Sequence, residues 1–184
     1  MPAARDAPDQ RAEAWLVLRA QAGDRDALES LLRRIEPAAQ RYIAGLTRAS
    51  PDAEDVLQTV MLTVVRKITA LRDPALFRPW LYRIASRESF RSLRAEREWR
   101  GLIDDGTAPD SMADSSELED QLIRRIDVPS LVARLSLGSR TVVTLHYMEG
   151  LSLSEVATSL GLSVGTVKSR LAYALAQLRA GPAL

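Results

Sequence analysis

The chain has 184 residues, of which 46% are apolar and 27% charged, and its formal net charge is +1. This composition predicts a soluble globular protein of one domain or two small ones. Because the net charge is small, any affinity for nucleic acid must come from local basic patches. The chain has no cysteine and one histidine, His146, which excludes disulfides, cysteine-based catalysis and zinc sites built from cysteine and histidine. We expect no metal and no cofactor.

No apolar run approaches the ~20 residues of a membrane-spanning helix, and the N-terminus lacks the apolar core of a signal peptide. We therefore expect a cytoplasmic protein without membrane insertion. The sequence also offers no glycine loop for binding phosphate and no motif that pairs a nucleophile with a base. An enzyme with a small-molecule substrate is not expected.

The first hundred residues are predicted to be almost wholly helical after a short tail. Residues 1–10, with two prolines among scattered charges, are expected to be disordered. Residues 11–100 lack the alternation that is typical of strands. Breaks at Gly23, near Pro51 and at Arg72 divide them into separate helices. The pattern predicts one small helical domain.

A helix with a wide apolar arc is expected from Asp52 to about Ile68. Its apolar residues form two neighbouring stripes, Val56, Val60, Val64 and Ile68 beside Leu57, Met61 and Val65. Such an arc fits a helix that is buried in a bundle. It fits equally well a helix that uses part of the arc to dock another protein, with Asp55 and Gln58 at its polar edge.

The helix that begins near Phe77 has arginine at every third or fourth position. These residues are Arg83, Arg87, Arg91 and Arg94. Like charges on one helix face repel by a few tenths of a kcal/mol per pair, so an anionic partner is expected. Phe77, Trp80 and Tyr82 offer aromatic faces for unstacked bases, worth about 1–3 kcal/mol per base. The alternative is that Phe77 and Trp80 belong to the hydrophobic core.

Residues 101–126 change character and then give way to a second helical segment. Glycine, proline and serine interrupt any pattern in this stretch, and acidic residues dominate its charge. It is expected to be a flexible acidic linker. Residues 127–180 resume the helical pattern and predict a second small domain.

The run from Gly150 to Arg170 has the form of a helix-turn-helix DNA reader. Ser152 or Ser154 is expected to cap the first helix, and Gly161 to end it in the left-handed conformation. The second helix is expected from Val164 to about Leu178, with an N-cap at Ser163. Its predicted apolar stripe consists of Val164, Val167, Leu171, Leu175 and Leu178.

The opposite face of the second helix is small, polar and basic, as is typical of a recognition helix in the major groove. The residues expected to contact duplex DNA are Ser163, Val164, Gly165, Thr166, Lys168, Ser169 and Arg170. The alternative is an ordinary helical hairpin with a solvated polar face. The cap, the turn glycine, the small residue Ala157 and the basic face together favour DNA binding.

These blocks, in this order, resemble bacterial RNA polymerase sigma factors of the extracytoplasmic-function group. The resemblance covers about residues 20–178 and depends on Asp52–Gln58, Phe77–Ala85 and Tyr147–Arg170. It implies an all-α fold in which a sigma region 2 bundle and a sigma region 4 helix-turn-helix domain are joined by the linker. It also implies a protein without catalytic activity, with core RNA polymerase, promoter DNA and an anti-sigma factor as partners.

The resemblance assigns roles to single residues. Those implied to contact the clamp helices of the polymerase's largest subunit are Asp52, Asp55, Leu57, Gln58 and Met61. Those implied to hold the minus-10 element are Arg72, Asp73, Phe77, Arg78, Trp80, Arg83, Arg87 and Arg91. The seven residues of the helix-turn-helix would read the minus-35 element. Arg87 stands where the family usually has asparagine, a departure that bears on the minus-10 base preference.

The leading hypothesis is a sigma factor that reads duplex DNA at minus 35 and melts DNA at minus 10. Promoter elements about 17 base pairs apart are separated by roughly 58 Å, and a fully extended linker of residues 101–126 reaches about 85–95 Å. One alternative is a helix-turn-helix regulator independent of core polymerase, which would need a receiver or ligand domain of alternating strands and helices. Another is a sigma mimic that sequesters an anti-sigma factor. The basic residues Arg83, Arg87, Lys168 and Arg170 favour the sigma factor.

Overall fold

The computed structural model describes residues 7–47, 53–93 and 128–179 of the chain. Every regular element in these three ranges is helical, so the predicted all-α class is confirmed for them. The elements are α1 (Ala7–Gln21), α2 (Arg25–Thr47), α3 (Ala53–Lys67), the 3-10 turns η1 (Ile68–Ala70) and η2 (Pro74–Leu76), α4 (Phe77–Ser92), α7 (Val128–Ala133), α8 (Leu137–Val143), the π-helical turn η3 (Thr144–Met148), α9 (Leu153–Leu160) and α10 (Val164–Arg179).

Some predicted features lie outside the described residues. They are residues 1–6, Asp52, Arg94 and the linker at 101–126. The prediction that residues 7–10 are disordered is wrong, because these residues belong to α1. An ion pair between Asp9 and Arg34 of α2 ties this part of α1 to the bundle.

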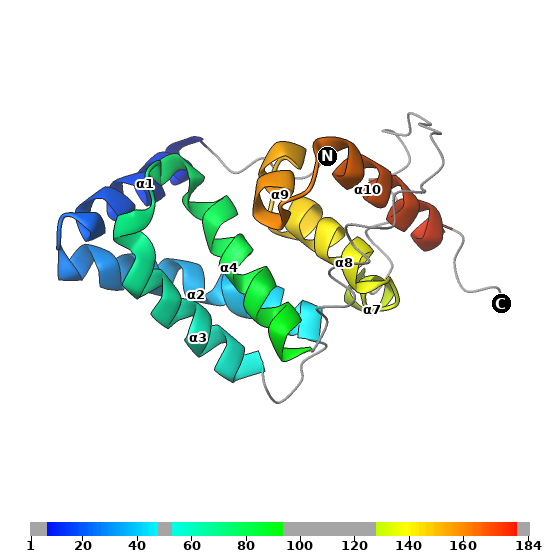
Figure 1. The fold of residues 1–184 in the computed structure, drawn as a ribbon, viewed down its shortest axis with the longest axis horizontal. Helices are drawn as coiled ribbons and strands as arrows, with labels where there is room; N and C mark the ends of the chain where they lie inside the picture. Colours follow the sequence, from blue (N-terminus) through cyan, green and yellow to red (C-terminus); the bar gives the residue numbers. More distant parts are fainter. Residues whose placement is uncertain (1–6, 48–52, 94–127, 180–184) are drawn as a thin grey trace.

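Helices α1 to α4 form a bundle in which each helix packs against the next (Figure 1). The sequence dictates this arrangement most clearly in α2, whose buried residues recur every three or four positions, as at Leu31, Ile35, Ala38, Tyr42 and Leu46. Gly23, with φ of 91°, allows the chain to reverse after α1. Asp24 then accepts a hydrogen bond from the Ala27 backbone N–H at 3.0 Å and so starts α2.

Helices α7 to α10 gather at the other end of the molecule (Figure 1). They enclose a small core of their own, formed by Val132, Leu135, Val143 and Ala174. Ser136 caps α8 by accepting from the Ser139 backbone N–H, at 3.4 Å. The chain then passes through η3 and turns at Gly150, which has φ of 68°.

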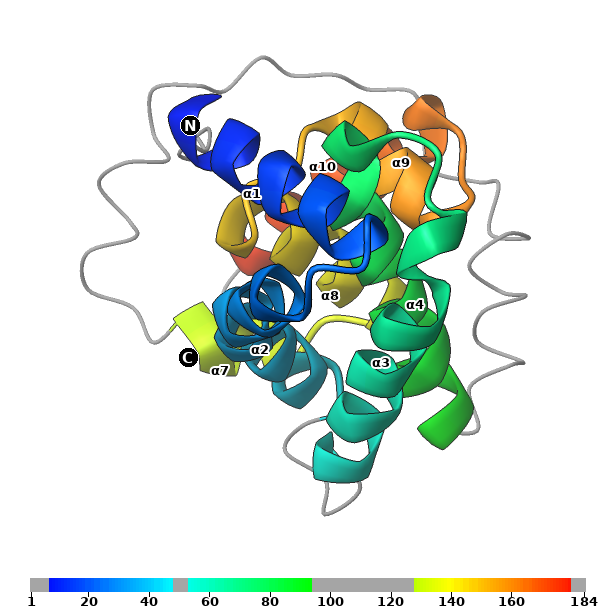
Figure 2. The same cartoon turned by 90° about the vertical axis from the view of Figure 1, so that its left-hand side faces the viewer.

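The two ends of the molecule are packed against each other. Helix α4 lies along α9, and α2 contacts α7, α8 and η3 (Figures 1 and 2). A continuous cluster of buried apolar side chains crosses this boundary and includes Leu81 and Ala85 of α4 together with Val156 and Leu160 of α9. The described parts of the two predicted domains therefore share one hydrophobic core.

Candidate nucleic-acid interface

The helix-turn-helix is built by three local signals that the sequence predicted. Ser152 caps α9 in a full capping box, in which Ser152 Oγ accepts from the Glu155 backbone N–H and Glu155 accepts from that of Ser152. Gly161 ends α9 in the left-handed conformation, with φ of 68°. Ser163 Oγ then accepts from the Thr166 backbone N–H at 3.0 Å and begins α10. Of the two candidate caps of α9, the structure selects Ser152.

The first turns of α10 present the predicted DNA-reading residues. Ser163, Val164, Gly165 and Lys168 are exposed, whereas Thr166, Ser169 and Arg170 are half-buried. Two hydroxyl groups are engaged within the helix. Thr166 Oγ1 lies 2.8 Å from Ser163 Oγ, and Ser169 Oγ donates to the Thr166 carbonyl at 3.1 Å. The exposed set therefore combines one charge with small and apolar groups.

The predicted apolar stripe of α10 is correct in its middle and wrong at its start. Val167 is fully buried, and Leu171 packs against the core. Val164 is 40% exposed, and Ala174 is the buried residue on the next turns. Helix α10 packs against both α8 and α9, and this packing buries Ala174. Spacing of three or four residues alone could not distinguish Ala174 from Leu175 as the buried position.

The segment between α3 and α4 is held in place from α1. The Gln21 side chain donates to the carbonyl oxygens of Ile68 and Leu71, at 2.8 and 2.7 Å. Asp73 caps η2 by accepting from the Ala75 backbone N–H at 2.9 Å. Arg72 and Asp73 are both exposed. A short loop fixed at these points presents its side chains in a defined position next to α4.

The outer face of α4 is basic. Arg83, Arg87 and Arg91 are exposed, so the predicted arginine face is confirmed over these three residues. Arg91 pairs with Glu88 at 3.0 Å. This surface ion pair contributes little stability, and it engages only one of the three guanidinium groups. A row of exposed guanidinium groups is suited to the phosphates of nucleic acid.

Phe77 and Arg78 do not belong to this face. Phe77 is in the core, and Trp80 is half-buried against it, with ring centroids 5.9 Å apart. The Arg78 guanidinium forms a mostly buried ion pair with Glu13 of α1, at 2.6 Å. Burial lowers the pKa of Arg78, but the hydrogen bonds and charge of Glu13 outweigh this effect and the pKa is raised. As described, neither side chain is presented to DNA, because one fills the core and the other neutralises Glu13.

Helix α3 has an exposed face of mixed character. Asp55 and Gln58 are exposed as predicted, and Met61 is half-buried. Leu57 is buried in the core, so its side chain does not reach this surface. The sequence did not single out Leu62, which is 47% exposed. It placed Val65 in the apolar arc without indicating that this residue is 40% exposed. The unusual width of that arc was the signal, since a helix in a small bundle cannot bury all of it.

In the described part of the chain, no group of three or more histidine, cysteine or acidic residues is arranged to hold a metal ion. Nor is any helix in those ranges long and apolar enough to cross a membrane. The polar features that stand out are the recognition-type helix, the basic outer face of α4 and the mixed outer face of α3. They define an all-helical DNA-binding protein that combines a helix-turn-helix with a helical bundle.

Comparison with known proteins narrows this class. Sigma-70 region 2 matches residues 27–99, and sigma-70 region 4 matches residues 125–178. The ECF RNA polymerase sigma factor SigM of Mycobacterium tuberculosis is 33% identical over 170 residues, which cover 92% of this chain and 84% of SigM. The RNA polymerase sigma-H factor of Pseudomonas aeruginosa is 30% identical over 173 residues, covering 88% of this chain and 89% of that protein.

Two solved structures share the fold. CnrH in complex with the cytosolic domain of CnrY has a TM-score of 0.67 and 27% identity, and the match covers 92% of this chain and 96% of CnrH. The sigma factor RpoE of Bartonella quintana, in complex with the anti-sigma factor NepR, has a TM-score of 0.62 and 24% identity, with 83% and 94% covered. The second likeness is one of fold alone.

The chain belongs to the ECF sigma factors of bacterial RNA polymerase. Its function follows from that membership: it binds core RNA polymerase and directs promoter-specific initiation of transcription. Sigma factors are not enzymes. The match to region 2 across α2 to α4 also removes the alternative of a helix-turn-helix regulator that works without core polymerase.

Proposed function

We propose that three surfaces of this sigma factor divide its work. The outer face of α3, formed by Asp55, Gln58, Leu62 and Val65, docks on core polymerase. The loop at Arg72–Asp73 and the outer face of α4 engage the minus-10 DNA, and the exposed residues in the first turns of α10 read the minus-35 duplex. The observation that carries the two DNA-binding assignments is that Arg83 and Arg87 of α4 and Lys168 of α10 are exposed on two separate helices.

The docking assignment rests on mixed chemistry. Leu62 and Val65 supply exposed apolar area beside the polar Gln58, which is the composition of a protein interface rather than of a nucleic-acid interface. The minus-10 assignment rests on charge. Three exposed guanidinium groups on α4 can bind phosphates, while the flanking loop is fixed by Gln21 and Asp73.

The minus-35 assignment rests on helix geometry. The first turn of α10 is exposed and free of bulky side chains at Gly165, so the helix can approach base edges closely. Lys168 lies one turn farther along the helix, within reach of a phosphate or a base edge. The sigma factor is proposed to act in the cytoplasm, where its polymerase and template are found.

We also propose an anti-sigma partner for this chain. The support is that both solved relatives were captured in complexes, one with the cytosolic domain of CnrY and one with the anti-sigma factor NepR. A partner of this kind would compete with core polymerase for the exposed face of α3.

Run-off transcription with core polymerase and a promoter library tests the proposal. Gln58→Ala should lower initiation on every template, because it weakens docking. Lys168→Ala should lower initiation on duplex promoters more than on templates already melted around the start site. Gln177→Ala, at an exposed residue near the end of α10, serves as the control and should match the unmodified protein. Equal losses on both templates for Lys168→Ala would remove Lys168 from the minus-35 surface.

A further inference from the structure

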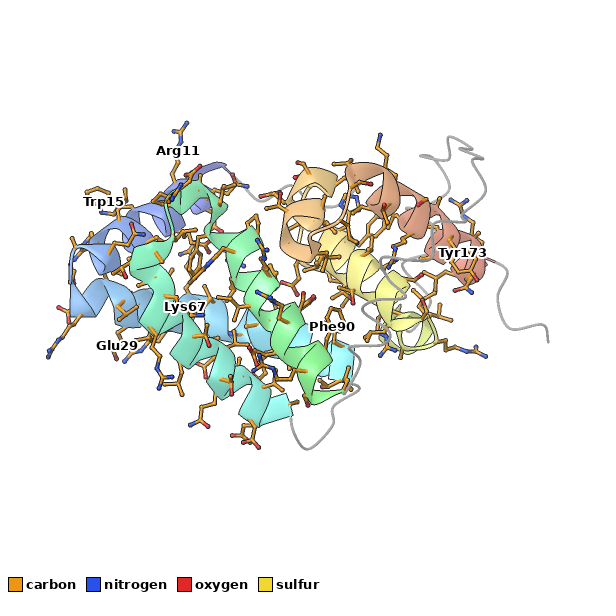
Figure 3. The ribbon with its side chains drawn as sticks, in the orientation of Figure 1. Arg11, Trp15, Glu29, Lys67, Phe90 and Tyr173 are labelled. Carbon is orange, nitrogen blue, oxygen red and sulfur yellow. The ribbon has the colours of Figure 1, made fainter. Side chains whose placement is uncertain are left out.

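The outward side of helix α1 carries the most exposed aromatic ring in the described ranges. Trp15 is 61% exposed, and Leu18, about one turn further along, is 47% exposed. Arg11, four residues before Trp15, is also exposed (Figure 3). Residues three and four apart share a helix face, so the three side chains lie on one side of α1. A single exposed leucine needs no explanation, whereas a tryptophan in this position leaves a large aromatic surface in water.

The charges of α1 leave one guanidinium group on this side. The two carboxylates of the helix, at Asp9 and Glu13, form ion pairs with arginines of α2 and α4. Arg19, the other arginine of α1, pairs with Asp24. Among the residues that the structure describes, no carboxylate lies within ion-pair distance of Arg11. The exposed ring therefore lies on the same side of the helix as a positive charge that the fold does not use.

Helix α1 lies alongside the loop that is proposed to engage the minus-10 DNA. It contacts both η1 and η2, and its Gln21 side chain binds the carbonyl oxygens at the start of that loop (Figure 2). A hollow of about 200 Å³ lies between α1 and η2, and Arg11, Pro74 and Ala75 are among the residues that line it. Glu155 also lines this hollow, and its carboxylate is engaged in the capping box of α9. The basic side of α1 and the loop therefore belong to one surface.

The chemistry of this side of α1 suits a nucleotide better than a protein. A stable protein interface buries about 800 Å² on each partner. The large exposed apolar side chains that the structure describes on α1 are Trp15 and Leu18, which is too little area for such an interface. One unstacked base needs only one aromatic face, and a neighbouring guanidinium group can bind a phosphate of the same strand. Trp15 and Arg11 supply these two groups.

We propose that Trp15 stacks on a base of the unpaired promoter strand and that Arg11 binds a phosphate of that strand. Elements in contact lie about 8–10 Å apart, and a stacked strand advances about 3.4 Å per nucleotide. The stacked base therefore lies about three nucleotides from the bases at the loop. The match to sigma-70 region 2 begins at residue 27 and does not include α1. This inference rests on the proposed engagement of minus-10 DNA by the loop and α4.

The first test titrates holoenzyme, assembled from core polymerase and the full chain, with a promoter already melted around its start site. Trp15→Leu keeps an apolar side chain but removes the aromatic face, and it should weaken binding about 5-fold or more. Trp15→Phe should retain most of the affinity. Tyr173→Leu is the matched control, since Tyr173 is an exposed aromatic residue on α10, at the other end of the molecule from Trp15 (Figure 3). Stacking is overturned if Trp15→Leu binds like this control, or if Trp15→Phe loses as much affinity as Trp15→Leu.

Removing single bases from the unpaired strand identifies the partner of Trp15. At one position, an abasic site should weaken the unmodified holoenzyme by the same factor as Trp15→Leu and should cost the Trp15→Leu holoenzyme nothing further. Losses that multiply at every position would overturn the stacking contact. Arg11→Gln should lower the slope of log affinity against log salt concentration by about 0.7, because one phosphate contact is lost. An unchanged slope would overturn the role of Arg11.

Two further measurements separate this inference from its alternatives. Binding of core polymerase in the absence of DNA should be the same for Trp15→Leu and the unmodified chain. A loss there as large as the loss on the promoter would make this side of α1 a protein-docking surface and overturn the inference. Arg87→Ala, on the same melted promoter, tests the proposed function.

The combined outcomes assign each failure to one statement. If Arg87→Ala weakens binding and Trp15→Leu does not, the inference fails and the minus-10 assignment of α4 stands. If Trp15→Leu weakens binding and Arg87→Ala does not, Trp15 keeps its role and the assignment of α4 is rejected. If neither substitution has an effect, both statements are rejected.

Discussion

Helix α4 carries arginines on two sides, and those on the outer side differ in environment from the one on the inner side. On its outer side, Arg83 and Arg87 are exposed and available to nucleic acid. On its inner side, Arg78 forms an ion pair with Glu13, and the Tyr82 hydroxyl donates a hydrogen bond to Glu149. The comparison shows that exposure, rather than residue type, separates residues that act on partners from residues that hold the fold. The same division applies to Leu57 and Leu62 of α3, one buried and the other exposed.

The largest expected effect comes from replacing Arg78 of α4, with the replacement of Arg83 as the comparison. Arg78→Met leaves Glu13 buried without its main partner, and we expect it to lower the free energy of unfolding by about 3–5 kcal/mol. Arg83→Met, at an exposed position on the same helix, should change stability by no more than about 0.5 kcal/mol. Chemical denaturation measures both. Equal losses of stability would erase the distinction between the two sides of α4.

The inner side can also be weakened by alkaline pH. Burial raises the pKa of Tyr42 and of Tyr82 above the ordinary value of 10.0. The contribution of these two tyrosines to the free energy of unfolding is fully present below pH 10. It falls as the pH rises further, because the unfolded chain releases protons that the folded chain keeps. The slope is at most about 1.4 kcal/mol per pH unit for each tyrosine.

Thermal melting between pH 9 and 11 gives this slope. Tyr82→Phe and Tyr42→Phe should each remove about half of it, apart from their constant effects on stability. A slope that survives both substitutions together would assign the alkaline instability to other groups.

Leu62→Ala tests the proposed docking face of α3. We expect this substitution to weaken binding to core polymerase by about 1–2 kcal/mol, because it removes exposed apolar area from the proposed docking face. Its effect on stability should stay within about 0.5 kcal/mol. Leu57→Ala, in the core, should lower stability by about 2–5 kcal/mol. Binding titration with core polymerase and denaturation of the free protein separate the two, and an unchanged affinity for Leu62→Ala would argue against the docking face.

The smallest expected effect concerns the first turn of α10. An added Cβ at Gly165 would meet only Ser163 Oγ at 3.6 Å, so Gly165→Ala fits the free protein. Replacing glycine in a helix should raise stability by up to about 1 kcal/mol. The same methyl group would lie on the proposed DNA-reading surface and should lower initiation from duplex promoters. A rise in stability with no change in initiation would place Gly165 outside the contact with DNA.

Much of the helix-turn-helix could be predicted from the sequence because its signals are local. Ser152, Gly161 and Ser163 act within three or four residues of themselves, so the caps and the left-handed turn could be predicted from the order of residues. The breaks at Gly23 and Arg72 could be predicted for the same reason. That the arginines of α4 share one helix face also followed from spacing, because residues four apart lie on the same face.

Two predicted site residues are covered by segments that lie far away in the chain. Arg78 was predicted to face DNA, but its partner Glu13 is 65 residues away in the chain. Leu57 was predicted to dock polymerase, yet the rest of the bundle covers it. Helical periodicity assigns residues to faces and does not say which face a neighbouring helix will occupy.

The sequence by itself determined the helical class, the caps and turns, and the resemblance to a sigma factor, because these depend on short-range hydrogen bonding and on the order of motifs. Tertiary structure alone decided which charges are exposed and that the two halves share a core. Tyr82 and Glu149 are 67 residues apart, and the motifs that contain them do not indicate that the two side chains pair. Their pairing exists because burial makes an unpartnered carboxylate costly, and only the folded chain brings the tyrosine hydroxyl to it.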